Sequence, residues 1–315
     1  MGLHVIAGSG PIGSAVAAAL LERGEQVTIV TRGVSGPEGT QRIAGDLGGK
    51  GGAELLTEAA AGATAIYNCV NPAYHRWATD WPPIADALLL AAERTGAVLA
   101  VTGNLYGYGP VSAPMTESTP AGALGTKGKV RNTMTDNAFA AHRAGRVRTF
   151  EARGSDYLGG SSMLSMIAFP AWRAGKRALL PGPAGVPHTF TDVRDMAAML
   201  VTGVFDERAH GRIWHVPSGE PTTLGTVIRA AADRLGVPGN VLHLPRWAVY
   251  AAGVTDPFVR ELRETQHQFR GPFVMDSTAA QQTFGLRPHG FDDSIGFDIA
   301  RNWAASPAAR STAGA

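Results

Sequence analysis

The feature that most constrains the fold of this chain is a glycine cluster directly after a short apolar segment. Residues 3–7, LHVIA, have the apolar character of a buried strand, and GSGPIG follows at once. Gly8, Gly10 and Gly13 therefore form the pattern G-x-G-x-x-G between a strand and the helical stretch SAVAAALLERG. Such glycines permit a tight turn and close approach of the backbone to a pyrophosphate, which the free N–H groups of the helix then bind. The pattern predicts a dinucleotide-binding loop, with a purely structural turn as the alternative. The predicted cofactor-binding residues of the loop are Gly8, Gly10, Pro11, Ile12 and Gly13.

Strand-like and helix-like segments alternate through the first half of the chain. The expected strands are residues 3–7, 26–32, 42–47, 63–70, 97–103 and 146–154. The expected helices between them are residues 14–24, 52–62, 84–95 and 127–145. Alternation of this kind predicts a parallel sheet that is covered by helices on both faces and joined by right-handed crossovers. The expected fold class is therefore α/β, a doubly wound parallel sheet of the Rossmann type.

The rhythm changes after residue 154, where Pro and Gly become dense. A strand over 188–193, a helix over 192–204 and a strand over 212–218 are still expected. We therefore assign residues 1–154 and 187–218 to the dinucleotide-binding domain. A smaller mixed α/β substrate-binding region is assigned to residues 155–186 and 219–304, and residues 305–315 are predicted to form a disordered polar tail.

Composition excludes several classes of function. The formal net charge is +2, and no run of Lys or Arg forms the patch that nucleic-acid binding requires. The apolar run IADALLLAA is too short to cross a membrane, and the N-terminus leads straight into a strand without a signal peptide. The nine histidines show no metal-ligand spacing and no G-x-S-x-G hydrolase motif occurs, so no metal is expected. These observations predict a cytoplasmic enzyme with a small-molecule substrate.

The end of the second expected strand indicates which dinucleotide is bound. An NAD site usually has an acidic residue about 20 residues past the glycines, on the ribose hydroxyls. Here the strand ends in Thr31, Arg32 and Gly33 without an acid. Because arginine suits a 2′-phosphate, we predict NADP, with NAD as the alternative. Asp46, after the third strand, is expected near the adenine amino group.

Four segments of the chain carry a further signal through their order and spacing. They are Ala7, Gly10 and Gly13 as a variant of G-x-x-G-x-x-G, GDL (45–47), VTGNLYGYG (101–109) and HTFTDVRDMAAML (188–200). In this order they resemble the NAD(P)-dependent epimerase/dehydratase family, the extended short-chain dehydrogenase/reductases. The resemblance spans roughly residues 1–300. It implies that Asp46 and Leu47 lie on the adenine side and that Val70 and Asn71 contact the cofactor. It also implies a homodimer.

The family's catalytic set is Ser or Thr with Tyr-x-x-x-Lys, and this chain departs from it. Aligned on its own segments, Thr102 takes the Ser/Thr position and Lys129 the lysine position, where it would bind the nicotinamide ribose. The tyrosine position holds Gly125. The chain therefore resembles an atypical branch of the superfamily in which Tyr or Asn stands near the upstream Ser position, as Asn104 and Tyr106 do.

Reduction of a carbonyl needs a positioned proton donor, and glycine has none to give. Tyr106 and Tyr108 follow the fifth strand, and Tyr157 follows the sixth, at the edge of the sheet where ligands bind. We predict that one of these tyrosines replaces the missing one, and His188 is a fourth option. The structural alternatives are packing for Tyr106 and a loop aromatic over the nicotinamide for Tyr108.

Three functions remain open on the sequence. The first is an NADP-dependent oxidoreductase for a small carbonyl compound or alcohol, with a non-standard proton donor. The second is a redox-neutral epimerase, dehydratase or isomerase, and the third is a non-catalytic NAD(P)-binding sensor. C-terminal aromatics favour an apolar or aromatic substrate over a charged nucleotide sugar, although Arg260, Arg263 and Arg270 offer an alternative site for an acidic group. These aromatics are Trp172, Trp214, Trp247, Phe258, Phe269 and Phe273.

Overall fold

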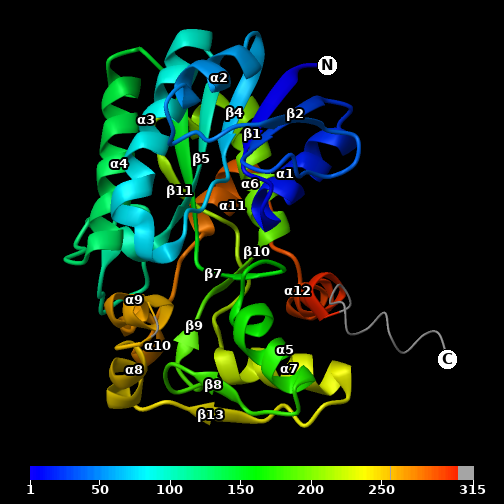
Figure 1. The fold of residues 1–315 in the computed structure, drawn as a ribbon, viewed down its shortest axis with the longest axis vertical. Coiled ribbons are helices and arrows are strands. Elements are labelled where there is room, and N and C mark those ends of the chain that lie inside the picture. Colours follow the sequence, from blue (N-terminus) through cyan, green and yellow to red (C-terminus); the bar gives the residue numbers. More distant parts are fainter. Residues whose placement is uncertain (256, 304–315) are drawn as a thin grey trace, which may run out of the picture.

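The computed structural model describes residues 1–255 and 257–303 of the chain, and its centre is a seven-stranded parallel sheet (Figure 1). The strand order is β11-β6-β5-β4-β1-β2-β3, so the order reverses beside β1 as a doubly wound sheet requires. The strands are β1 (Leu3–Ala7), β2 (Gln26–Thr31), β3 (Gln41–Ala44), β4 (Ala63–Asn68), β5 (Val98–Asn104), β6 (Thr149–Gly154) and β11 (Ile213–His215). The predicted fold class is confirmed.

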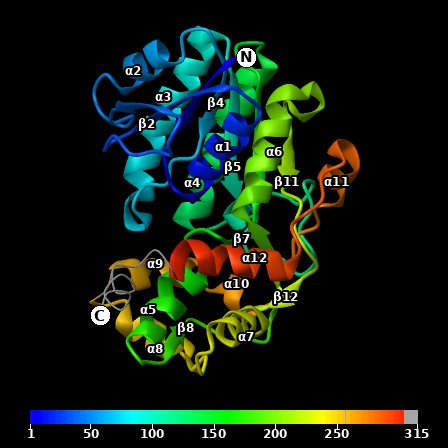
Figure 2. The ribbon, with the colours of Figure 1, turned by 90° about the vertical axis from the view of Figure 1, so that its right-hand side faces the viewer.

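Helices cover both faces of this sheet. One face carries α1 (Pro11–Glu22) and α6 (Val193–Phe205), and the other carries α2 (Gly52–Ala59), α3 (Trp77–Thr95) and α4 (Thr126–Arg143). Figure 2 shows α1 and α6 lying side by side in front of the strands. Because side chains alternate along a strand, Ile6 of β1 enters the core under α1 while its neighbours Val5 and Ala7 enter the core under α3. Both cores are apolar, as a sheet buried on two faces requires.

Two predicted elements differ clearly from the observed ones. The helix predicted over 84–95 begins at Trp77, and its added N-terminal part contains Pro82 and Pro83 and buries the rings of Trp77 and Trp81. A short helix, η1 (Tyr74–Arg76), leads into it. The strand predicted over 188–193 is split in two, because its halves pair with different partners. β9 (Pro187–His188) pairs with β12 (Thr222–Thr223), and β10 (Phe190–Asp192) pairs with β7 (Asp156–Leu158).

A smaller lobe lies beyond the carboxyl ends of the sheet strands (Figure 1). Its core contains Leu158, Phe169, Leu224 and Ile228. Its elements are η3 (Leu164–Ala168), α5 (Phe169–Arg173), β8 (Ala178–Leu180), α7 (Leu224–Leu235), β13 (Val241–His243), α8 (Arg246–Ala252), α9 (Pro257–Thr265), α10 (His267–Arg270), α12 (Phe291–Asp298) and η5 (Ile299–Trp303). Of two further short helices, η2 (Leu105–Tyr108) follows β5 and η4 (Glu207–Ala209) follows α6.

One element of the C-terminal range packs on the large sheet instead of the smaller lobe. Helix α11 (Thr278–Phe284) contacts β11, with the ring of Phe284 edge-on to that of Trp214 at 4.8 Å. The predicted tail, residues 305–315, lies outside the described residues. Within the described part of the chain, no helix has the length and apolar character needed to cross a bilayer.

Candidate active site

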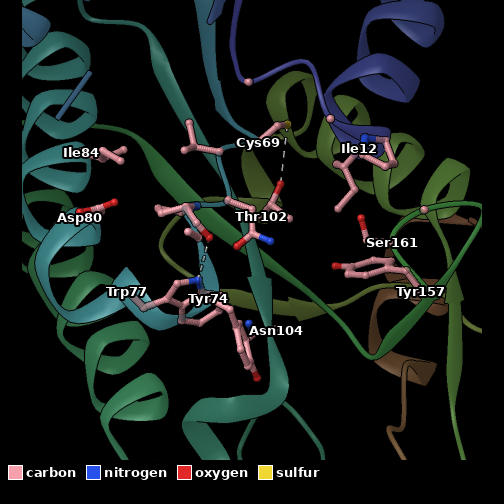
Figure 3. A pocket seen from close by; sticks show the side chains of 18 of the residues that line it. Ile12, Cys69, Tyr74, Trp77, Asp80, Ile84, Thr102, Asn104, Tyr157 and Ser161 are labelled. Atoms are coloured by element: carbon pink, nitrogen blue, oxygen red, sulfur yellow. Dashed lines mark hydrogen bonds between the residues drawn. The ribbon is translucent and has the colours of Figure 1, made fainter. Parts of the chain in front are cut away.

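A cavity of about 1480 Å³ lies between the carboxyl ends of the strands and the smaller lobe. It is lined by the glycine loop, by the ends of β2, β4 and β5, and by residues after β6 (Figure 3). Its opposite wall is supplied by Phe269 and Phe273. Ligands of open α/β sheets bind at this edge, and the volume exceeds that of sites for a single drug-sized ligand. The cavity therefore has room for a dinucleotide together with a substrate.

The three glycines of the loop differ in the space that a side chain would have at each position. Gly8 has φ +99°, and a Cβ there would lie 2.6 Å from the carbonyl oxygen of Cys69. A Cβ on Gly13 would lie 2.0 Å from the carbonyl oxygen of Gly8, so this glycine allows α1 to pack against the loop. Gly10 caps α1 and has open space around its Cα, and Pro11 occupies the first helical position. The loop thus presents an open helix N-terminus to the cavity, which fits a pyrophosphate. The loop residues that line the cavity are Gly8, Gly10, Pro11 and Ile12, with Gly13 beneath them.

The far end of the cavity carries the residues predicted to bind the adenosine half of the cofactor, Thr31, Arg32, Asp46 and Leu47. Val70 and Asn71, which are predicted to contact the cofactor, also line the cavity. Arg32 is exposed, and Ser35 beside it shares a hydroxyl hydrogen bond of 2.6 Å with Ser9. The pKa of Asp80 is lowered, chiefly by its hydrogen bonds with Arg76 and further by the charge of Arg32. Cationic and hydroxyl groups therefore meet at this end.

The other end of the cavity collects polar side chains from β5 and from the segment after β6. Thr102 donates to the Sγ atom of Cys69 over 3.8 Å, and burial raises the pKa of that thiol to about 12. The side chain of Asn104 accepts from the backbone N–H of Tyr106 and caps η2. The phenol of Tyr106 accepts a hydrogen bond of 3.2 Å from Tyr74. All four predicted residues that line this end, Thr102, Asn104, Tyr106 and Tyr157, thus come together.

Tyr157 also lines this end of the cavity, and Figure 3 shows its ring next to Ser161. Its hydroxyl donates to the carbonyl oxygen of Gly103 over 3.3 Å. Burial raises the pKa of Tyr157, and the nearby Arg131 guanidinium opposes this rise. The phenol is therefore protonated at neutral pH and lies close to a cation.

Arg131 is a site residue that the motif alignment missed. It lines the cavity from α4, donates to the carbonyl oxygen of Thr102 over 3.0 Å, and lies 4.9 and 4.5 Å from the ring centroids of Trp77 and Trp81. Burial lowers the pKa of Arg131, although arginine stays charged. Helical periodicity was the available signal, because Lys127 and Arg131 repeat at a spacing of four, as Gly125 and Lys129 do.

The structure does not bring Lys129 into the cavity. Helix α4 turns Lys127, Gly128 and Arg131 inward, which leaves Lys129 exposed. Lys127 is 2% exposed and forms ion pairs with Glu261 and Glu264 of α9. The expected contact of Lys129 with the nicotinamide ribose therefore has no geometric basis here.

Tyr108 also lies outside the cavity. Its ring packs in a small core with Leu105, Met115 and Phe273, because η2 points it away from the sheet edge. Its hydroxyl is 2.8 Å from Nε2 of His215, so the phenol is already paired. This placement does not suit a proton donor. Among the described residues, no group of three or more His, Cys, Asp and Glu side chains is arranged to hold a metal.

Comparisons with known proteins agree with this geometry. No family model matches the chain. A curated dTDP-6-deoxy-L-talose 4-dehydrogenase (NAD(P)(+)) from Kitasatospora kifunensis is 26% identical over 304 residues, which cover 90% of each chain. A solved UDP-glucose 4-epimerase superposes with a TM-score of 0.79 at 15% identity, over 99% of this chain and 98% of that one. A dTDP-glucose 4,6-dehydratase from Streptomyces venezuelae with NAD bound gives a TM-score of 0.78 at 16% identity, over 98% and 99%.

The solved structures share the fold, and the curated relative adds similarity of sequence over nearly the whole chain. These relatives are enzymes, and the names of the dehydrogenase and the dehydratase record NAD(P) and NAD. The chain therefore has the fold of the solved epimerase and dehydratase structures, and it is similar in sequence to a curated NAD(P)-dependent dehydrogenase over nearly its whole length.

Proposed function

We propose that the chain is an NADP-dependent oxidoreductase that reduces a carbonyl group, or oxidises the corresponding alcohol, on a small sugar-like metabolite. The observation that carries the proposal is the continuity of the cavity. Arg32 lies at one end of the cavity, and Thr102 and Tyr157 lie at the other. The glycine loop lines the same cavity. The similarity to NAD(P)-dependent dehydrogenases, dehydratases and epimerases of sugar nucleotides supports a substrate that resembles a sugar.

The preference for NADP rests on the end of β2. An aspartate or glutamate there would favour the ribose hydroxyls of NAD, whereas Arg32 is an exposed cation on the cavity wall. Thr31 and Ser35 add hydroxyl groups beside it, with the backbone N–H of Ser35 held on the Thr31 hydroxyl at 3.3 Å. These donors and this charge suit a 2′-phosphate.

The protein's part in the reaction would be to hold the carbonyl and supply a proton. A nicotinamide cofactor, when bound, supplies the hydride. We propose that the Tyr157 phenol donates the proton to the developing alkoxide and that Thr102 hydrogen-bonds the same oxygen. Arg131 would stabilise the phenolate that remains, as a nearby cation does. Tyr106, which lines the same end, is the second candidate for the donor, but its hydroxyl is shared with Tyr74.

Two other functions are compatible with the fold. A redox-neutral epimerase or dehydratase would use the same cofactor and the same proton donor in both directions, and the solved relatives include both kinds of enzyme. A non-catalytic NADP sensor would need only the cofactor half of the cavity.

Measuring deuteride transfer separates the oxidoreductase from the other two functions. The full chain is incubated with NADPH carrying deuterium at C4, in either of the two stereoisomers, and with a panel of small hydroxyketones and keto sugars. The proposal predicts deuterium in an alcohol product from one stereoisomer only, detected by mass spectrometry. If NADPH binds but no deuterium leaves either stereoisomer, the oxidoreductase assignment fails.

A further inference from the structure

The substrate half of the cavity carries very little charge. We use this name for the part lined by Asp156, Ser162, Met166, Gln268, Phe269 and Phe273. Among these described residues, Asp156 is the only one with a formal charge. The arginines that line the cavity lie elsewhere, because Arg32 and Arg76 belong to the adenosine end and Arg131 is stacked on tryptophans under the end of β5. The wall that faces the substrate therefore combines apolar and neutral polar side chains with one carboxylate.

Asp156 is held in place by a buried histidine. Its Oδ2 atom lies 3.1 Å from Nε2 of His188, whose side chain is 5% exposed, while Asp156 keeps 25% of its side chain exposed at the cavity. The imidazole lies among the rings of Phe190, Phe269 and Phe273, at centroid distances of 4.9, 6.2 and 5.2 Å. The Asp156 carboxylate therefore lies between this aromatic packing and the substrate half.

Asp156 also lies near the phenols that line the proposed reaction site. Burial is the main cause of the raised pKa of Tyr74, Tyr106 and Tyr157, and the negative charge of Asp156 adds to the rise for all three. A group bound to Asp156 would therefore lie next to Tyr157.

The arginines of the smaller lobe do not supply the missing positive charge. Arg270 donates to the carbonyl oxygen of Pro181 over 3.1 Å, and Arg263 donates to that of Tyr250. Arg260 donates to the carbonyl oxygen of Gly253 over 3.1 Å. None of these three arginines lines the cavity, so the sequence-based alternative that they hold an acidic group of the substrate has no support here.

A nucleoside diphosphate would fit this wall poorly. Its phosphates need several donors or cations, and placing them beside the Asp156 carboxylate adds like-charge repulsion and desolvation. By their names, the relatives described above act on nucleoside diphosphate sugars. We propose that this chain instead takes a small substrate without phosphate, one of whose hydroxyl groups donates a hydrogen bond to Asp156. This inference rests on the proposed function, since it names the substrate class of that site.

Calorimetric titration of the NADPH-saturated full chain with dTDP and with UDP tests the inference. We expect no binding up to millimolar concentration. Asp156→Asn should then bind dTDP at least about tenfold more tightly than the wild type, because the like-charge penalty is gone. Asp136→Asn, which removes an exposed carboxylate of α4, should behave like the wild type.

Micromolar binding of dTDP or UDP to the wild-type holoprotein would overturn the inference, and so would an Asp156→Asn variant that binds dTDP no better than Asp136→Asn. NADPH is titrated into each protein first. If the wild type does not bind NADPH, the proposed function is refuted. If it binds dTDP while NADPH is bound, only the substrate class is refuted.

Discussion

The phenolic oxygen of Tyr157 lies 3.3 Å from the carbonyl oxygen of Gly103, and the guanidinium of Arg131 donates to the carbonyl of the preceding residue, Thr102. Two successive carbonyls of β5 therefore fix a phenol and a cation at the same strand end. In the proposed function this pair would take the roles of Tyr and Lys in the family motif, with Tyr157 coming from β7 and Arg131 from α4.

Replacing Tyr157 with phenylalanine should remove the proton donor while preserving the shape of the ring. We expect Tyr157→Phe to lower kcat by roughly 10²- to 10⁴-fold, the usual contribution of a general acid. NADPH affinity should stay within about threefold of the wild type, because the phenol makes no predicted contact with the phosphates or adenosine. The measurement is turnover on the ketone identified by deuteride transfer. Near-normal kcat would transfer the role to Tyr106.

Tyr108→Phe is the matched control and a prediction of its own. The change removes the 2.8 Å contact with Nε2 of His215 and leaves a buried ring nitrogen without its partner. We expect unfolding free energy to fall by about 1–3 kcal/mol, with kcat nearly unchanged. Denaturant titration and turnover measured on the same preparation check both parts. A large loss of kcat without loss of stability would contradict the placement of Tyr108 outside the site.

Lys127 and Lys129 are two residues apart on α4 but differ in environment. Lys127→Met removes the ion pairs that hold Glu261 and Glu264 of α9 against α4, and it leaves two carboxylates facing each other. We expect a loss of about 1–3 kcal/mol in unfolding free energy, because the partner carboxylates are partly exposed and can rehydrate. Lys129→Met should change stability by less than about 0.5 kcal/mol and leave NADPH binding intact. Weakened NADPH binding by Lys129→Met would restore the ribose contact predicted from the motif.

Asp195 should make stability depend on pH in the acid range. Burial raises the pKa of Asp195 to about 6, although hydrogen bonds from the side chain and backbone of His289 oppose the rise. The folded state therefore keeps a proton that the unfolded chain, with an ordinary pKa near 3.8, has released. This contribution is complete below pH 4 and disappears as pH rises to 6, so it makes stability fall across that window.

Asp195→Asn isolates this effect because asparagine cannot titrate there. Relative to the wild type, the variant should gain roughly 1–3 kcal/mol of unfolding free energy between pH 4 and pH 6. Urea titrations at intervals of half a pH unit measure the difference. A constant difference across the window would show that Asp195 is ionised in the folded protein.

The dinucleotide half of the molecule could be predicted from sequence because its signals are local. Each expected strand from 3–7 to 146–154 is present, since apolar runs bounded by glycines specify buried parallel strands. The roles of Gly8 and Gly13 follow from contacts within 65 residues of chain, and the pattern G-x-G-x-x-G encodes them directly.

The end of the cavity that contains Thr102 and Tyr157 was harder to predict. Its geometry depends on the rotation of helix α4 about its axis and on contacts between residues far apart in sequence. Gly125 and Lys129 match the spacing of the family motif, but packing turns Lys127 and Arg131 inward instead. That rotation is set partly by Glu264, which lies 137 residues away in sequence and pairs with Lys127. Asp156 and His188 are also in contact, and His188 belongs to β9, which is separate from β10. No local sequence pattern predicted that these two strands are separate.

The central claim, an NADP site that spans the glycine loop and Arg32, is tested most directly by calorimetric titration with NADPH and NADH. The wild type should bind NADPH with micromolar affinity and at least about tenfold more tightly than NADH. Arg32→Ala should lose the preference for NADPH, with NADH binding unchanged. The control Arg42→Ala removes an exposed arginine that donates a hydrogen bond to the carbonyl oxygen of Pro37, and it should keep the preference. Absence of binding of either nucleotide to the wild type, or equal losses for both in Arg32→Ala, would contradict the account.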